Sequence, residues 1–189
     1  SYRASVRSDK IFVVDLYTAN VLYELRQLGN NRLPYPSMSF PNIKVFYPYR
    51  LTKKVFDDIG EEYARRFSPF HISKAGLREE RSKIVMAVRP SMKKDIELAG
   101  LKNGLFIYSL WSGYRENDYQ RDFEKTLEKQ GFTLDSLHTS GHASVADIRR
   151  VILGLSPKQI VPIHTMSPEM LSEFSEKVVI GEDGVSFDV

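Results

Sequence analysis

Short apolar runs that alternate with helical segments are the feature that most constrains the fold of this chain. The runs cover residues 11–16, 43–47, 83–88, 105–110 and 158–163. Runs of this length, bounded by polar residues, are typical of strands buried on both faces of a sheet. Because helical periodicity lies between them, the sequence predicts an α/β fold with a mainly parallel, Rossmann-like sheet flanked by helices.

Spacing and capping residues predict the helices between these runs. Thr18 is the expected cap of a helix that Gly29 ends, and one continuous helix is expected over residues 52–67. Further helices are expected over residues 73–81, 92–98, 116–129, 144–153 and 168–174. Residues 132–138 are expected to be extended, and 178–180 with 185–187 are expected to form a closing hairpin.

The composition excludes several classes of protein. At 189 residues, with 42% hydrophobic and 27% charged residues, the chain suits one good-sized core or one domain with an excursion. No apolar run approaches the roughly 20 residues of a membrane helix, and the first ten residues resemble no targeting signal. The absence of cysteine excludes disulfides and thiolate ligands and fits a reducing, cytoplasmic location. A net charge of +3 permits a polyanionic partner without indicating one.

Residues 33–49 contain prolines and aromatic residues, and from Lys44 to Lys54 aromatic and basic residues interleave. Two interpretations are open. Such a segment can stack bases and pair with phosphates, or its rings can pack on the core as an aromatic-rich loop. The packing interpretation is favoured, because it requires no partner.

Three of the four histidines lie between residues 137 and 165, which makes this stretch the best candidate for a site. His138 and His142 flank the small residues Thr-Ser-Gly, and His164 follows an apolar run. The fourth, His71, lies alone in a Phe/Ser-rich stretch. A histidine is often only a packed or solvated side chain, so the number of histidines alone predicts no chemistry.

Three turns follow expected strands, and ligands of open parallel sheets bind at the carboxyl ends of the strands. The turns cover residues 110–113, 139–142 and 164–167. In the middle turn, small residues let backbone N–H groups converge, and the helix that begins near Ser144 directs its positive end to the same place. The turn is a candidate anion site, although a plain connection between strand and helix has the same residues.

His164 is the best candidate for a metal ligand, because a strand end would fix the direction of its side chain. His138 and His142 are four residues apart, but the turn between them disfavours helical ligation. One to three histidines do not form a zinc site without further ligands, and the chain contains no His-x-His-x-Asp-His run. It also lacks the Gly-x-Ser-x-Gly elbow of an α/β-hydrolase, the third class considered.

Two linked motifs resemble those of a known family. His-x-Ser-Gly-His-Ala at 138–143, followed by Pro-x-His at 162–164, resembles the C-terminal half of β-CASP metallo-β-lactamase-fold nucleases. This is the group of ribonuclease J and the cleavage and polyadenylation endonuclease. Residues 13–19 are similar to the first strand and helix of the inserted β-CASP domain, and residues 105–114 to its later strand and phosphate-facing turn.

The resemblance implies two domains and a role for each matched residue. Residues 1–135 would form the β-CASP domain, and 136–189 an αβ segment, ending in the hairpin, of the metallo-β-lactamase fold. His142 would be the catalytic histidine near the scissile phosphate, and His164 would bind one of two zinc ions. Six further residues would lie along the phosphates of the nucleic acid; they are His138, Ser140, Gly141, Ser109, Ser112 and Gly113.

Other parts of the family pattern do not occur in this sequence. The His-x-His-x-Asp-His motif, a further histidine and a bridging aspartate would lie upstream of the β-CASP insert, and Thr165-Met166 replaces the Gly-Glu that often follows Pro-x-His. Because residues 1–7 resemble the end of a helix, we expect the chain to be a fragment whose partner is its missing N-terminal half.

The expected function follows from this resemblance. The intact parent would be a zinc-dependent nuclease that acts on RNA rather than DNA. The fragment alone would be inactive and would not hold two zinc ions at full occupancy. The alternative is a non-catalytic nucleic-acid-binding or scaffold module of the same fold.

Overall fold

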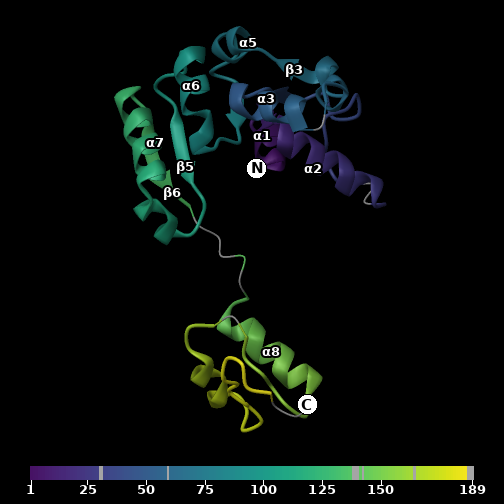
Figure 1. The fold of residues 1–189 in the computed structure, drawn as a ribbon, viewed down its shortest axis with the longest axis vertical. Coiled ribbons are helices and arrows are strands. Elements are labelled where there is room, and N and C mark those ends of the chain that lie inside the picture. The colour runs from purple at the N-terminus through teal and green to yellow at the C-terminus, as the bar shows by residue number, and fades with distance from the viewer. Residues whose placement is uncertain (30–31, 59, 138–140, 142, 164, 187–189) are drawn as a thin grey trace. The chain divides into compact units, whose positions relative to one another are not determined.

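Parallel strands and the helices that connect them form the first of two units, Ser1–His138, and the second unit covers Thr139–Val189 (Figure 1). The computed structural model describes residues 1–29, 32–58, 60–137, 141, 143–163 and 165–186. In these ranges, no helix is long and apolar enough to cross a membrane.

The elements of the first unit alternate as the sequence predicts. Its strands are β1 (Ile11–Asp15), β2 (Ile43–Phe46), β3 (His71–Ile72), β4 (Ile84–Met86), β5 (Leu105–Tyr108) and β6 (Thr133–Ser136). Its α-helices are α1 (Tyr2–Arg7), α2 (Leu16–Gln27), α3 (Tyr49–Asp58), α4 (Glu62–Arg65), α5 (Lys74–Glu79), α6 (Lys93–Ala99) and α7 (Asp118–Lys129). Short 3-10 helices are η1 (Ser68–Phe70), η2 (Pro90–Met92) and η3 (Ser112–Glu116).

These strands form two parallel sheets. The first has the order β3-β2-β1-β4, and the second pairs β5 with β6. Helices flank both sheets, so the predicted α/β class with parallel sheets is confirmed. The expectation of one continuous sheet is wrong for the described strands, since β5 pairs with β6 and with no strand of the first sheet.

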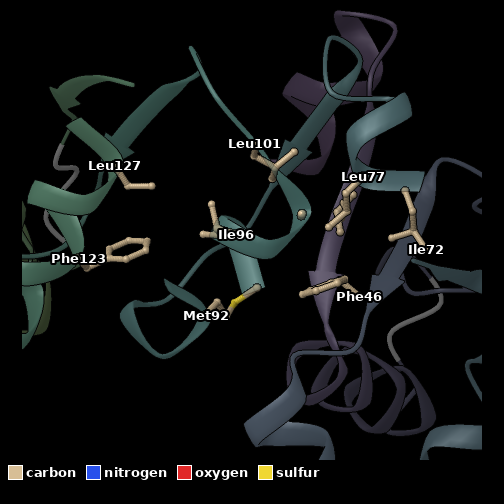
Figure 2. Packing of buried hydrophobic residues seen from close by; sticks show 10 residues of the cluster. Phe46, Ile72, Leu77, Met92, Ile96, Leu101, Phe123 and Leu127 are labelled. Atoms are coloured by element: carbon tan, nitrogen blue, oxygen red, sulfur yellow. The ribbon is translucent and has the colours of Figure 1, made fainter. Parts of the chain in front are cut away.

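Strand β1 lies at the centre of the first sheet and separates two hydrophobic clusters. Successive side chains of a strand point to opposite faces. Val13 accordingly packs in one cluster with Phe46, and Val14 packs in the other with Val45. In the first cluster, Met92 and the α6 side chains lie between α7 and the sheet (Figure 2). The predicted burial on both faces is confirmed for β1.

Strand β5 departs from that prediction. Leu105 and Ile107 are 60% and 47% exposed, whereas Tyr108 is buried. The alternation shows that β5 is covered on one face, towards α7, where Phe106 packs edge-on against Phe123 with their centroids 5.7 Å apart. An apolar run of this length is compatible with either environment, and the sequence alone did not separate them.

Two predicted helix signals are placed differently in the structure. Asp15, not Thr18, caps α2, because the Asp15 carboxylate accepts a hydrogen bond from the Thr18 N–H at 2.7 Å. The helix expected over 52–67 divides into α3 and α4, since Gly60 adopts a φ of +114°, a left-handed conformation open to glycine. Both helices still bury side chains in the cluster that contains Val14, as one continuous helix would have done.

The aromatic residues of segment 33–54 mostly pack on the core, as favoured. Tyr35 and Phe40 lie edge-to-face, with centroids 6.2 Å apart, and Phe40 contacts Tyr2 in the same way. The Tyr47 hydroxyl donates to the Ala64 carbonyl at 2.6 Å. Tyr35, Phe40 and Tyr47 are therefore engaged within the fold, whereas Tyr49 is 69% exposed.

The second unit contains α8 (Val145–Leu155) and the 3-10 helix η4 (Pro168–Glu173). The strand expected over 158–163 reduces to one parallel bridge between Ile160 and Val178. Pro162 has no N–H to donate, which shortens any ladder here. Among the described residues, 178–180 do not pair with 185–186, so the expected hairpin is absent from this part of the chain.

The Asp15 side chain joins three elements at the end of β1. It is 3% exposed and pairs with Arg89, whose other terminal nitrogen donates to the Thr18 hydroxyl at 3.1 Å. The Arg89 guanidinium also lies 5.2 Å from the centre of the Tyr17 ring. A carboxylate buried this deeply requires such partners.

Replacing Asp15 by Ala should lower the free energy of unfolding by about 2 kcal/mol, because it removes a helix cap and the partner of Arg89. The matched control is Glu61→Ala, which removes an ion pair to Arg65 whose side chains are 61% and 77% exposed. That variant should lose less than about 0.5 kcal/mol. Urea unfolding measures both changes, and equal losses would contradict the role of Asp15.

His71 belongs to β3 rather than to a loop, and its ring lies 4.6 Å from that of Tyr47. Desolvation there lowers the pKa of His71 below its ordinary value.

A lowered pKa of His71 in the folded state contributes stability that is present above the unfolded pKa, about 6.5, and is lost as the pH falls through the folded pKa. The free energy of unfolding should therefore fall more steeply from about pH 7 to about pH 5 in the wild type than in His71→Gln. Urea unfolding across this pH range measures the free energy of unfolding of both proteins. Parallel pH profiles would contradict the contribution of His71.

Candidate functional site

The structure describes four of the residues expected to form the site. They are Ser109, Ser112, Gly113 and Gly141. The other four lie outside the described residues; they are His138, Ser140, His142 and His164. Gly141 is exposed, and a Cβ at this position would meet no atom within 4 Å, so no steric constraint requires glycine there.

Two candidate segments leave the same edge of the second sheet. Strands β5 and β6 are parallel and in register, with Tyr108 opposite Ser136. The Leu137 N–H donates to the Tyr108 carbonyl at 2.9 Å, so the pairing continues one residue beyond β6. Ser109 follows β5 at this edge, beside Leu137, the last described residue before 138–140. The described ends of the two candidate segments therefore lie at the same edge of this sheet.

The third expected turn has a different setting. Residues 165–167 belong to the second unit and do not follow a strand among the described residues. The Ser167 N–H donates to the Thr165 hydroxyl at 3.2 Å, which makes this a local side-chain turn.

A cluster of polar and aromatic side chains holds the turn after β5. Tyr108 is buried, with 3% of its surface exposed. Its hydroxyl donates to the Trp111 carbonyl at 3.0 Å. Arg115 lies with its guanidinium carbon 4.9 Å from the centre of the Tyr108 ring and donates to both carboxylate oxygens of Glu124, at 2.8 to 3.2 Å. Gln120 donates to the same carboxylate at 2.7 Å. The turn is therefore fixed to α7.

The charges in this cluster stabilise one protonation state. The hydrogen bond to Glu124 is the main cause that raises the pKa of Arg115, which stays a cation. Burial is the main cause that raises the pKa of Tyr108, and the Glu124 carboxylate adds to it. Tyr108 is consequently a neutral hydroxyl that can donate to Trp111 at any physiological pH.

Two large rings project from this turn. Trp111 and Tyr114 are 61% and 60% exposed, and their ring centres lie 5.5 Å apart with an angle of 89° between the planes. The indole covers Gly113 so closely that a Cβ there would collide with the ring. Gly113 thus has a packing role in the structure, and its contact with RNA stays a prediction.

The residues that hold this turn could not be predicted from the local sequence. Ser109, Ser112 and Gly113 were expected at the site, but Arg115 and Glu124, which lie nine positions apart, were not. The one local signal was the pair of aromatic residues on either side of Ser-Gly at 111–114.

The described residues do not form a metal site. Within these ranges, no group of three or more His, Cys, Asp or Glu side chains could hold a metal ion. The buried carboxylates Asp15 and Asp95 are each paired with a cation, Arg89 and Lys74 respectively. They are therefore structural groups in this part of the chain.

A comparison with protein families identifies the C-terminal part of the chain. Residues 132–185 match the family described as the Zn-dependent metallo-hydrolase RNA specificity domain (RMMBL), over less than a third of the chain. The match fits the C-terminal part of a β-CASP metallo-β-lactamase-fold nuclease, the resemblance noted in the sequence. The matched residues include all of β6. Among curated proteins, none matches the chain.

Replacing Gly113 by Ala should displace the Trp111 ring, since the added Cβ would occupy the position of the indole. Trp111 is the only tryptophan in the chain, so its near-ultraviolet circular dichroism and emission report the change directly. The control is Gly154→Ala in α8, where a Cβ meets nothing within 4 Å. This control should leave Trp111 unchanged and add roughly 0.5–1 kcal/mol of stability. Unaltered Trp111 signals in Gly113→Ala would contradict the packing.

Proposed function

From the match of residues 132–185, we propose that this chain is the RNA-recognising C-terminal part of a zinc-dependent nuclease that hydrolyses phosphodiester bonds. The observation that carries the proposal is the match itself, whose description names both a metallo-hydrolase and RNA specificity. Residues 1–135 are assigned to a β-CASP domain and 136–189 to the metallo-β-lactamase fold. The lack of cysteine is compatible with a cytoplasmic location.

The roles of the histidines between residues 137 and 165 follow from the motifs. His142 acts next to the scissile phosphate, where a histidine can stabilise charge or transfer a proton. His164 is a ligand of one zinc ion, and His138 with Ser140 binds a terminal phosphate of the RNA. Support for a shared RNA path comes from the sheet, because Ser109 and Leu137 leave it side by side.

The residues of this chain do not fit a complete two-zinc centre. The motifs of this chain supply one proposed zinc ligand, His164, and the sequence contains no His-x-His-x-Asp-His run. Zinc would supply a Lewis acid and an activated water when bound, but no step through it can be assigned to these residues. The remaining ligands belong to an N-terminal half with which this chain assembles.

The second unit supports such an assembly. None of its described side chains is fully buried, and Leu153 and Leu155 of α8 are 61% and 74% exposed. A segment of about 50 residues without a buried core gains little stability on its own. Packing against other parts of the protein would provide that core.

The first test is metal content and activity. The purified chain should retain well below two zinc ions per molecule after dialysis, because it lacks the other ligands, and it should not cleave single-stranded RNA. Elemental analysis and a gel assay measure this. Two tightly bound zinc ions together with cleavage would overturn the need for a second half.

The second test is recognition of the RNA end. His138→Gln should reduce the preference for RNA with a terminal phosphate over RNA with a terminal hydroxyl roughly tenfold, the effect of one charge-assisted hydrogen bond. His71→Gln, which alters the β3 histidine, is the control and should keep the preference. Fluorescence anisotropy with both RNAs measures it, and the assignment fails if the wild type has no such preference.

A non-catalytic RNA-binding module of the same fold is the second candidate. The observation that favours it is the incomplete set of metal ligands in the sequence. Restoration of RNA cleavage by a metallo-β-lactamase half containing His-x-His-x-Asp-His would exclude this candidate. RNA binding without cleavage in that assembly would support it.

A further inference from the structure

The Trp111–Tyr114 pair is an exposed aromatic surface that the site assigned above does not use. Both rings are about three-fifths exposed. In an edge-to-face pair, each ring keeps at least one face that its partner does not cover. Exposed aromatic side chains gathered in this way are typical of binding surfaces.

Hydrogen bonds anchor the backbone that carries the pair. The Trp111 backbone is held by the Tyr108 hydroxyl and by the Tyr114 N–H, which donates to the Trp111 carbonyl at 3.1 Å. Its indole rests on Gly113, where there is no room for a Cβ. The Arg115–Glu124 pair then fixes the end of the turn to α7. A surface ordered in advance loses little entropy on binding.

We infer that Trp111 and Tyr114 form a stacking platform for the bases of single-stranded RNA. The inference rests on the proposed function and extends it to residues outside the matched segment. Its position supports it, because the platform follows β5, and β5 pairs along its whole length with β6 of the matched segment. Aromatic rings stack on any base, so the platform tolerates different sequences.

Stacking, rather than charge, is the contribution of this turn. Between Trp111 and Asp118 the one cationic side chain is Arg115, which pairs with Glu124. Glu116 and Asp118 in the same segment are acidic. The turn therefore does not attract phosphates by net charge. It should select unpaired bases, since the bases of a duplex are already stacked on one another.

The single tryptophan permits a direct test. Because the indole emission of this chain comes from Trp111 alone, a base stacked on the ring should quench it. The purified 189-residue chain is titrated with a single-stranded oligoadenylate, a duplex RNA of equal length and an abasic ribose-phosphate oligomer. We expect saturable quenching with the single strand and little with the other two. Acrylamide quenching without RNA establishes that the ring is accessible.

Variants test the contribution to affinity. Trp111→Ala and Tyr114→Ala should each weaken binding of the single strand about tenfold, measured by anisotropy of end-labelled RNA. Trp111→Phe, which keeps a ring, should weaken it less. The matched control is Tyr119→Ala, which removes a ring that is 52% exposed on α7, outside the platform, and should bind as the wild type does. Circular dichroism verifies that each variant is folded.

The outcomes separate this inference from the proposed function. If the wild type binds single-stranded RNA while the Trp111 emission stays constant and Trp111→Ala binds equally well, the platform is wrong and RNA recognition stands. Equal quenching by duplex or abasic RNA would also overturn the platform. If the wild type binds no RNA at all, both the platform and the proposed RNA recognition are overturned.

Discussion

The buried carboxylate of Asp15 is the interaction on which the first unit most depends. It ends the central strand, caps α2 through the Thr18 N–H and holds Arg89, which follows β4. Asp95 likewise joins two elements. It accepts a hydrogen bond from the Tyr49 N–H at the start of α3 and pairs with Lys74 of α5. Buried carboxylates need several donors at once, so each of them fixes the relative positions of the elements that supply those donors.

The sequence predicted β1, β2 and β4 of the first sheet because these strands are short apolar runs with polar ends, and it missed the two-residue strand β3. It failed where the local pattern is compatible with two structures. The spacing of Val55 and Phe67 fits one helix, yet Gly60 breaks it and both side chains still reach the same cluster. The run at 158–163 has the composition of a strand, but it forms one bridge at Ile160, because strand formation depends on a partner as well as on composition.

Sequence motifs located the candidate site, but the contacts that hold its described part together belong to residues outside these motifs. Histidine spacing identified the C-terminal segment, which the family match confirms over residues 132–185. The cluster of Tyr108, Arg115 and Glu124 has no sequence signature, because its members come from a strand, a 3-10 helix and an α-helix. Such contacts follow from the fold, so they could be recognised only after β5 and α7 had been placed.

The central position of β1 also has a consequence for the order of folding. Strand β1 is made before both of its neighbours, β2 and β4, which begin at Ile43 and Ile84. The edge that pairs with β2 can be satisfied first, whereas the edge that pairs with β4 stays unpaired until the ribosome has added about 70 residues beyond Asp15, at roughly 5–20 residues per second. Parallel pairing over such distances along the chain is slow. The edge of β1 that awaits β4 is consequently a place where a chaperone, or an error in pairing, would act.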